Sequence, residues 1–361
     1  MYNIQQAKSL RTRMIIFGAR GDLSVKRLKP AQRELFSNGL LLQAVDVDIK
    51  RDVRSILPPQ VSFPGANRYI CIDPNYSRDL DILIKLGFTG KGTLIYIATP
   101  TQFHVPYAQW ALRTGSWVAV EKPLTTNPNQ AACLLQEGNI RLSLVDHQLF
   151  KEAMLQAIAQ VTGEEILAAE SLEFELLETG NVGIREIENA IFDTGYHGFG
   201  CILALVESSM CLTGDQVEIN VGEVHTATYD RDSIGMRPKK FTAARIEGFI
   251  SFAGISVPFL ISVAKGVSCG SKKLVIRGKR NRTQRIIPLD ESGWCAHYRL
   301  LKRLITDDSP DLRIDEAGVL RTIEACRDAS DQARDQGYYE FGSIPSFLKG
   351  LVPNVGQLRC F

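Results

Sequence analysis

Short apolar runs alternate with helix-like segments along the first 145 residues. Five runs rich in Ile, Val, Leu and Phe have the length of β-strands, and the segments between them carry apolar residues at helical spacing. Strands that alternate with helices are joined by right-handed crossovers into a parallel sheet with helices on both faces. The pattern therefore predicts a doubly wound α/β domain over residues 1–145. Its strands are expected at 12–17, 42–48, 68–72, 93–98 and 117–120, and helices at 23–42 and 105–113.

The pattern changes after residue 146. Long strand-like runs follow one another with short polar turns, which is typical of an antiparallel sheet covered by helices on one face. We therefore expect a second, α+β domain over residues 146–361 with a largely antiparallel open sheet, joined to the first without a linker. Its strands are predicted at 171–177, 216–228, 241–252, 256–264, 273–277 and 284–288, and its helices at 151–161, 186–205, 296–305 and 314–335.

The composition is that of an ordinary globular protein. Its 361 residues suit two domains, and 42 basic against 40 acidic residues give no reason to expect a nucleic acid partner. No run approaches the roughly 20 apolar residues of a membrane span, and the N-terminus has no signal-peptide core. The eight cysteines stand singly without a Cys-x-x-Cys pair. We therefore expect a reduced, cytoplasmic protein with no metal site, disulfide framework or membrane partner.

A glycine turn follows the first predicted strand and begins a helix. It reads Gly18-Ala-Arg20-Gly21-Asp22-Leu23, in which Arg20 stands where a dinucleotide-binding turn has its middle glycine. Glycines let backbone amides approach a pyrophosphate, and a helix N-terminus offers unpaired N–H groups to it. We interpret Gly18, Gly21, Asp22 and Leu23 as cofactor-binding, with Arg20 contacting a phosphate or covering the adenine. An ordinary strand-to-helix turn is the alternative.

The end of the second predicted strand carries Asp46 and Asp48, at the distance expected for a ribose-binding carboxylate. Such a carboxylate accepts hydrogen bonds from the 2′-hydroxyl and repels a 2′-phosphate, so NAD is favoured and Asp48 is the predicted ligand. Lys50 and Arg51 follow directly and keep NADP open as the alternative.

Two further patterns resemble the glucose–fructose oxidoreductase and inositol dehydrogenase (Gfo/Idh/MocA) superfamily. The first spans residues 97–128 and contains Ala98-Thr99-Pro100, His104, Gly115 and Glu121-Lys122-Pro123 in the superfamily's order; the second is Asp193-x-Gly195-x-His197. The resemblance implies a Rossmann domain whose cofactor lies against Thr99, Pro100, His104, Glu121 and Lys122. It also implies that Lys122 touches nicotinamide and substrate, and that Pro123 shapes the turn, often through a cis bond. His104 is expected to be structural rather than catalytic.

Other segments resemble glucose-6-phosphate dehydrogenase. Residues 18–31, 257–265, 296–301 and 313–316 are similar to segments of that enzyme, and residues 146–152 (DHQLFKE) resemble its DHYLGKE motif. The resemblance implies that Asp146, His147, Lys151 and Lys265 bind a sugar or sugar phosphate. A solvated strand end is the alternative for Lys265.

This second resemblance has two departures. Gln148 replaces the phosphate-binding Tyr, and Phe150 replaces a Gly. The specific substrate glucose 6-phosphate is therefore disfavoured, although an anion site remains expected.

The reaction expected of these residues is hydride transfer at a carbinol. A histidine near its working pKa is an efficient base for the hydroxyl proton, and His197 takes that role. Asp193 lies four residues earlier and is expected to orient the imidazole or hold a neighbouring hydroxyl, with Asp146 as a second candidate orienter. Lys122 stays protonated and stabilises the developing alkoxide. No metal is needed, because the cofactor carries the electrons.

The sequence thus predicts a NAD(P)-dependent sugar or cyclitol dehydrogenase, its small-molecule substrate either phosphorylated or not. Two alternatives stay open, a glucose-6-phosphate 1-dehydrogenase and a catalytically silent nucleotide-binding regulator. A homo-oligomer, dimer or tetramer, is expected because an open sheet leaves a face that a second subunit can cover.

Overall fold

The computed structural model describes residues 11–19, 21, 23–49, 66–72, 77–138, 141–179, 189–230, 241–278, 282–306, 315–340 and 342–349. Contacts divide the chain into one unit of residues 1–152 and 291–313, and a second of residues 153–290 and 314–361. The predicted division placed residues 146–152 and 291–313 in the second domain, whereas the contacts group both segments with the first. Within the described residues, no helix combines the length and apolarity needed to span a bilayer.

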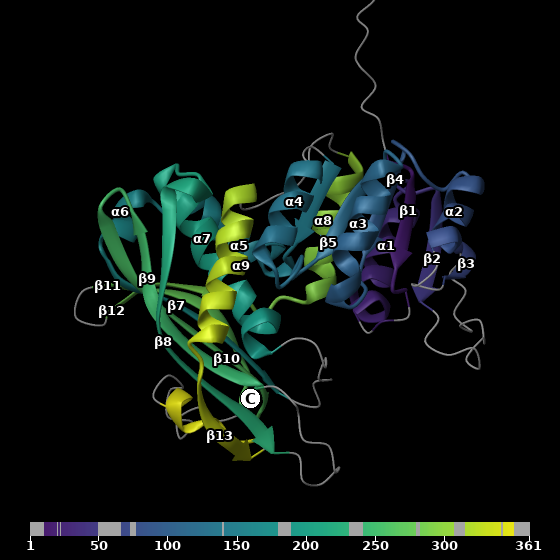
Figure 1. The fold of residues 1–361 in the computed structure, drawn as a ribbon. Coiled ribbons are helices and arrows are strands. Elements are labelled where there is room, and N and C mark those ends of the chain that lie inside the picture. Colours follow the sequence, from purple (N-terminus) through teal and green to yellow (C-terminus); the bar gives the residue numbers. More distant parts are fainter. Residues whose placement is uncertain are drawn as a thin grey trace, which may run out of the picture. The chain divides into compact units, whose positions relative to one another are not determined.

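The first unit contains the predicted doubly wound parallel sheet (Figure 1). Six strands follow the order β3-β2-β1-β4-β5-β6, and every pair in this sheet is parallel. The strands are β1 (Arg13–Phe17), β2 (Gln43–Ile49), β3 (Ala66–Ile72), β4 (Thr93–Ile97), β5 (Trp117–Glu121) and β6 (Leu142–Val145). All residues of β4 and β5 are buried, as expected for central strands covered on both faces.

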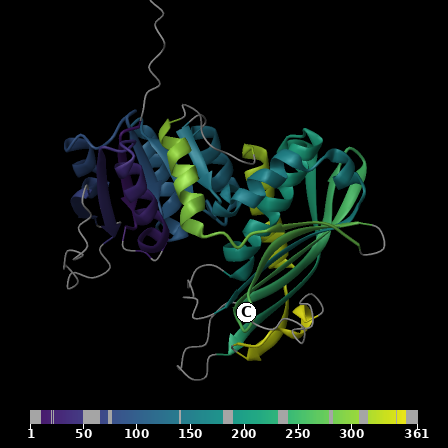
Figure 2. The same ribbon diagram turned by 180° about the vertical axis from the view of Figure 1, so that it is seen from behind.

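Helices connect these strands, and one helix reaches the unit from late in the chain. The connecting elements are the π-helical turn η1 (Ser24–Leu28), α1 (Lys29–Ser37), α2 (Ser77–Lys85), η2 (Thr101–Phe103), α3 (His104–Arg113), α4 (Pro128–Gly138) and η4 (His147–Phe150). The helix from late in the chain is α8 (Gly293–Thr306), which packs against α1, η1 and η4 (Figure 2). Its last carbonyls are bound by Arg11, whose guanidinium donates to Leu304 O and whose amide donates to Ile305 O.

The second unit is built on a seven-stranded mixed sheet of order β12-β11-β7-β10-β9-β8-β13 (Figure 1). Four of its pairs are antiparallel, while β10–β7 and β13–β8 are parallel. The strands are β7 (Ala169–Thr179), β8 (Val217–Asp230), β9 (Ala243–Phe252), β10 (Ile255–Val267), β11 (Ser271–Gly278), β12 (Arg282–Pro288) and β13 (Arg334–Glu340). The expected largely antiparallel sheet is confirmed.

One face of this sheet is covered by helices, namely α5 (Glu152–Gln160), α6 (Gly163–Leu167), the π-helical turn η5 (Ile191–Gly195), α7 (Tyr196–Met210), η6 (Gly214–Gln216) and α9 (Glu316–Asp331). The short turn η9 (Ser346–Leu348) packs on the other face, where Leu348 joins a cluster with Ala243 and Ala264. Gly198 lets α7 lie directly on the strands, because a Cβ there would be 2.8 Å from Ile261 and 2.9 Å from Phe174. The opposite face carries alternate residues of the strands, among them the half-exposed Phe249 of β9.

Several elements differ from the sequence-based expectation. The strand β6 and the helices α2, α4 and α6 had no predicted counterpart. The helix predicted at 314–335 ends at Asp331, and Arg334 begins β13. The helix predicted at 23–42 begins as a π-helical turn and ends at Ser37. Pro30 has no N–H for an ordinary helical bond to Lys26, and the wider turn lies just before it.

Candidate active site

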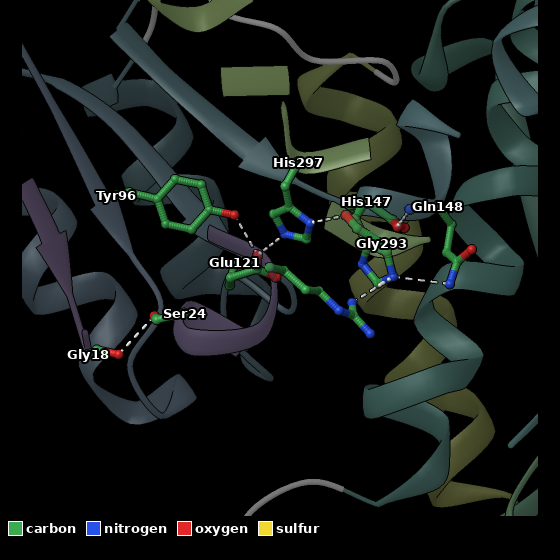
Figure 3. A network of polar contacts seen from close by, with 10 residues as sticks. Gly18, Ser24, Tyr96, Glu121, His147, Gln148, Gly293 and His297 are labelled. Carbon is green, nitrogen blue, oxygen red and sulfur yellow. Dashed lines mark hydrogen bonds and ion pairs between the residues drawn. The ribbon is translucent and has the colours of Figure 1, made fainter. Parts of the chain in front are cut away.

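The predicted glycine turn lies where three strands of the first unit end. Gly18 has φ +80°, and a Cβ on it would lie 2.5 Å from Ala98 O, so only glycine fits between this turn and the end of β4. The Gly18 amide donates to Val47 O of β2 at 2.8 Å. Ser24 Oγ donates to Gly18 O at 2.9 Å and fixes the start of the following helix (Figure 3). Arg20 and Asp22 lie outside the described residues.

The two carboxylates of β2 are not equivalent. Lys29 Nζ lies 2.8 Å from Asp46 Oδ2, and both side chains are almost fully buried. Asp46 is thereby engaged inside the unit, which leaves Asp48 as the ribose-binding candidate on this strand. The side chain of Asp48, like Lys50 and Arg51, lies outside the described residues.

His104 joins the turn after β4 to the turn after β5. Its ring is buried, with Nδ1 2.8 Å from Pro123 O and Nε2 2.8 Å from Thr99 O. The Lys122–Pro123 peptide bond is cis, as the resemblance implied. Lys122 is itself buried, at 6% exposure, and its amide donates to Val145 O at 3.1 Å. Backbone contacts therefore hold Thr99 and Lys122 in adjoining turns.

Glu121, the last residue of β5, is occupied by contacts within the unit. Its Oε1 accepts hydrogen bonds from Tyr96 Oη at 2.6 Å and from His297 Nε2 at 3.1 Å (Figure 3). Burial alone raises the pKa of this carboxyl group. The hydrogen bond and charge of His297, the Tyr96 hydroxyl and the charge of Lys122 outweigh burial and lower the pKa to about 2. Glu121 is therefore an anion throughout the neutral range.

His297 is a residue that sequence reasoning left without a role. It lies on α8, 176 positions after Glu121, and no spacing or motif connects the two. Only the similarity of residues 296–301 to a glucose-6-phosphate dehydrogenase segment drew attention to this stretch.

The DHQLFKE segment forms η4 and the start of α5. Asp146 Oδ1 accepts from the Gln148 amide at 3.0 Å and caps the turn. His147 Nε2 lies 3.0 Å from Arg27 Nη1, and because a guanidinium only donates, this ring nitrogen accepts. Lys151 is buried at the end of the turn, and its amide donates to Gln148 O at 3.3 Å. Arg27, to which the sequence assigned no role, thus fixes the tautomer of His147.

The remaining predicted site residues lie in the second unit. Asp193 is in η5 and His197 is buried in the first turn of α7. Lys265 Nζ forms an ion pair with Asp193 Oδ2, so the solvated-lysine alternative does not describe Lys265. Its backbone is also held, since Tyr339 Oη donates to Lys265 O at 2.7 Å.

Comparisons with known proteins identify the type of fold. Residues 80–139 match the model of the GFO/IDH/MocA oxidoreductase family, described as an NAD-binding Rossmann fold. No curated protein matches the chain by sequence.

Solved structures match the chain over most of its length. Glucose-6-phosphate 1-dehydrogenase from Mycobacterium avium has a TM-score of 0.70 at 16% identity, covering 95% of this chain and 97% of that chain. A myo-inositol dehydrogenase from Corynebacterium glutamicum has a TM-score of 0.60 at 14% identity, covering 89% and 96%. A 3-ketoreductase from Actinomadura kijaniata, crystallised with NADP, has a TM-score of 0.56 at 13% identity, covering 91% and 99%.

At these identities the structural likeness shows the fold alone. The resemblance seen in the sequence motifs is confirmed over residues 80–139, which carry the NAD-binding Rossmann fold of the GFO/IDH/MocA oxidoreductases, and the cofactor is a nicotinamide dinucleotide.

Proposed function

We propose that this protein transfers a hydride between NAD(P) and a carbinol carbon of a sugar, sugar phosphate or cyclitol. The observation that carries the proposal is the placement of Lys122. It is buried directly after β5, beside cis-Pro123, in a turn that His104 ties to Thr99. A lysine held at the carboxyl end of a central Rossmann strand is suited to hydrogen-bond an oxygen on the reacting carbon.

The residues of the first unit fit a dinucleotide. Gly18 has no side chain, so the turn stays open where the three strand ends meet. Gly21 begins the following helical turn, and the Val25 amide donates to its carbonyl at 3.0 Å. We assign the pyrophosphate to this turn and the nicotinamide end to Thr99, Pro100 and Lys122. The nicotinamide, when bound, supplies the hydride acceptor or donor. NAD is favoured, with Asp48 as the carboxylate for the ribose hydroxyls.

We assign the proton of the reacting hydroxyl to His197, because a buried imidazole can take it at neutral pH. Asp193 lies one turn earlier and would accept a hydrogen bond from a neighbouring substrate hydroxyl. Its ion pair with Lys265 keeps that carboxylate charged and oriented. Lys122 remains an ammonium group and stabilises alkoxide character as the hydride leaves.

Glucose 6-phosphate oxidation is the second candidate. The structural likeness to glucose-6-phosphate dehydrogenases, two of which have TM-scores of 0.70 and 0.63, favours it. Two features oppose it: Gln148 stands at the position of a phosphate-binding Tyr, and Arg27 occupies His147 Nε2. We therefore assign any anionic group of the substrate to Lys151 and Lys265, with His147 as a weaker ligand.

Steady-state assays of NAD and NADP reduction on a panel of polyols, cyclitols and sugar phosphates test the function. Lys122→Ala and His197→Ala should each lower kcat by at least about 100-fold while cofactor still binds. Lys302→Ala and His225→Ala are the matched controls, since neither residue is assigned to the site. Near-normal turnover of either site variant would sink the assignment. Cofactor binding with no turnover on the whole panel would favour a silent regulator instead.

We also propose that the chain forms a homo-oligomer through the sheet face opposite α7. Phe249 is half-exposed on that face and is paired in register with Pro258. Phe249→Glu should shift the mass measured by light scattering to that of a monomer. Ile82→Glu, at a similarly exposed position on α2, is the control. A monomeric wild-type protein would refute the proposal.

A further inference from the structure

His297 is completely buried on α8, and both of its ring nitrogens face acceptors. Nδ1 lies 2.7 Å from Gly293 O and Nε2 lies 3.1 Å from Glu121 Oε1 (Figure 3). His297 therefore connects the backbone of α8 to the Glu121 carboxylate through two short contacts inside the fold.

Other groups also act on this carboxylate. Tyr96 Oη donates to the same carboxylate oxygen, and burial and the neighbouring Glu121 raise the pKa of Tyr96, so it stays a neutral donor. Lys122, the next residue in the chain, is a cation whose charge lowers the pKa of Glu121. If the contact with His297 were lost, the buried Glu121 carboxylate would interact more strongly with the Lys122 ammonium.

His297 also contacts the second motif of the unit. Its ring stacks on that of His147, with centroids 5.4 Å apart and planes inclined by 21°. His147 Nε2 in turn accepts a hydrogen bond from Arg27. One side chain of α8 therefore contacts both the strand end before Lys122 and the DHQLFKE turn.

We propose that His297 is a positioning residue that acts through Glu121 on Lys122. The contact from His297 holds the Glu121 carboxylate inside the fold, so that the Lys122 ammonium is directed to the reacting oxygen and not to its neighbour in the chain. This rests on the proposed function of Lys122. Residues 291–313 return to the first unit and thereby supply the side chain that holds Glu121.

The test begins with the wild-type holoprotein and follows the proton of Lys122 directly. With ¹³C-labelled lysine, and Lys122→Arg for assignment, Lys122 should lose its proton about one pH unit higher in His297→Gln than in the wild type. Tyr96→Phe is the matched control: it removes a neutral hydrogen bond from the same oxygen and should leave this titration within about 0.3 pH units. Equal shifts in both variants, or none in His297→Gln, would contradict a charge-mediated role.

Turnover then separates positioning from general packing. His297→Gln should lower kcat about tenfold or more while the Kd for cofactor changes less than about threefold. Glu121→Gln/His297→Gln also removes the buried carboxylate charge and should recover stability and part of kcat relative to His297→Gln alone. If the wild type transfers no hydride, the proposed function fails while the titrations still read the His297–Glu121–Lys122 coupling. If hydride transfer occurs and the titrations are flat, only the positioning role fails.

Discussion

The Asp193 carboxylate and the Lys265 ammonium form an ion pair across 72 positions of the chain, between η5 and β10. Both side chains are largely buried, and the Lys265 backbone is held by bonds from its amide to Thr242 O and from Tyr339 Oη to its carbonyl. A charge pair at a strand end that is fixed on three sides is a pre-organised polar site rather than a solvated surface contact.

Breaking this pair should weaken substrate binding more than it lowers the stability of the fold. Lys265→Met leaves the Asp193 carboxylate without its cation, and we expect KM for the substrate found in the proposed assays to rise at least about tenfold with a stability loss of about 1–2 kcal/mol. Steady-state kinetics and urea unfolding measure the two effects. Lys272→Met is the control, because that ammonium lies 3.6 Å from Glu178 in a more exposed pair. Equal effects of the two variants would contradict a substrate role for Lys265.

Gly18→Ala should abolish cofactor binding by a steric route. The new Cβ would lie 2.5 Å from Ala98 O at a residue with φ +80°, so the turn has to move away from β4. We expect the Kd for NAD, measured by calorimetry, to rise at least about 30-fold. Gly39→Ala is a matched control, since Gly39 has φ +68° and no atom within 4 Å of its Cβ position. That variant should lose only about 1 kcal/mol of stability and keep its affinity; loss of affinity there too would point to general destabilisation.

Much of the fold could be predicted because the central strands are continuous apolar runs bounded by polar residues or glycine. β1, β4 and β5 differ from their predicted bounds by one residue at an end. β13 could not be predicted: its sequence is polar, and it is an edge strand formed by parallel pairing with β8. Pairing of this kind is decided by tertiary contacts and leaves no period in the sequence.

The candidate site was predicted where residues belong to motifs, and missed where one residue acts on another from a distance. Lys122 and His104 were found because they share a thirty-residue pattern. His297 was missed because its partner Glu121 lies far away in sequence, and Arg27 because only the folded unit brings it to His147. Likewise, the sequence does not distinguish Asp46 from Asp48, whereas in the fold Lys29 forms an ion pair with Asp46.

The difference between Asp46 and Asp48 on β2 predicts which of the two carboxylates sets the preference between NAD and NADP. Asp48→Ser should weaken NAD about tenfold and improve NADP, because it removes the carboxylate that repels a 2′-phosphate. Asp46→Asn should leave the NAD to NADP ratio within about twofold, since Asp46 is bound to Lys29 and its loss acts on stability. Kd values for both cofactors decide between them. A shifted ratio in Asp46→Asn would reassign the ribose carboxylate.

The last prediction concerns a carboxyl group inside the second unit. Glu207 is buried on α7, and its Oε1 has no hydrogen bond within the described residues. Burial, and then the charge of Asp315, raise the pKa of Glu207 to about 8, although the Asp315 amide lowers it. Asp315 cannot move away, because its carboxylate caps α9 at Gly318 N and accepts from Gly214 N.

A raised carboxyl pKa fixes the sign of the pH dependence. The folded protein keeps the Glu207 proton up to about pH 8, whereas the unfolded chain loses it near the ordinary glutamate value of about 4.3. The contribution to stability is therefore complete below about pH 4 and is lost as pH rises to about 8. Glu207→Gln keeps a neutral side chain, so its stability relative to wild type should grow across this range by on the order of 4 kcal/mol. Urea unfolding at pH 5 and pH 8.5 measures the difference. Glu218→Gln, at an exposed position on β8, is the control for the substitution itself. Parallel pH profiles for wild type and Glu207→Gln would show that Glu207 is ionised in the fold.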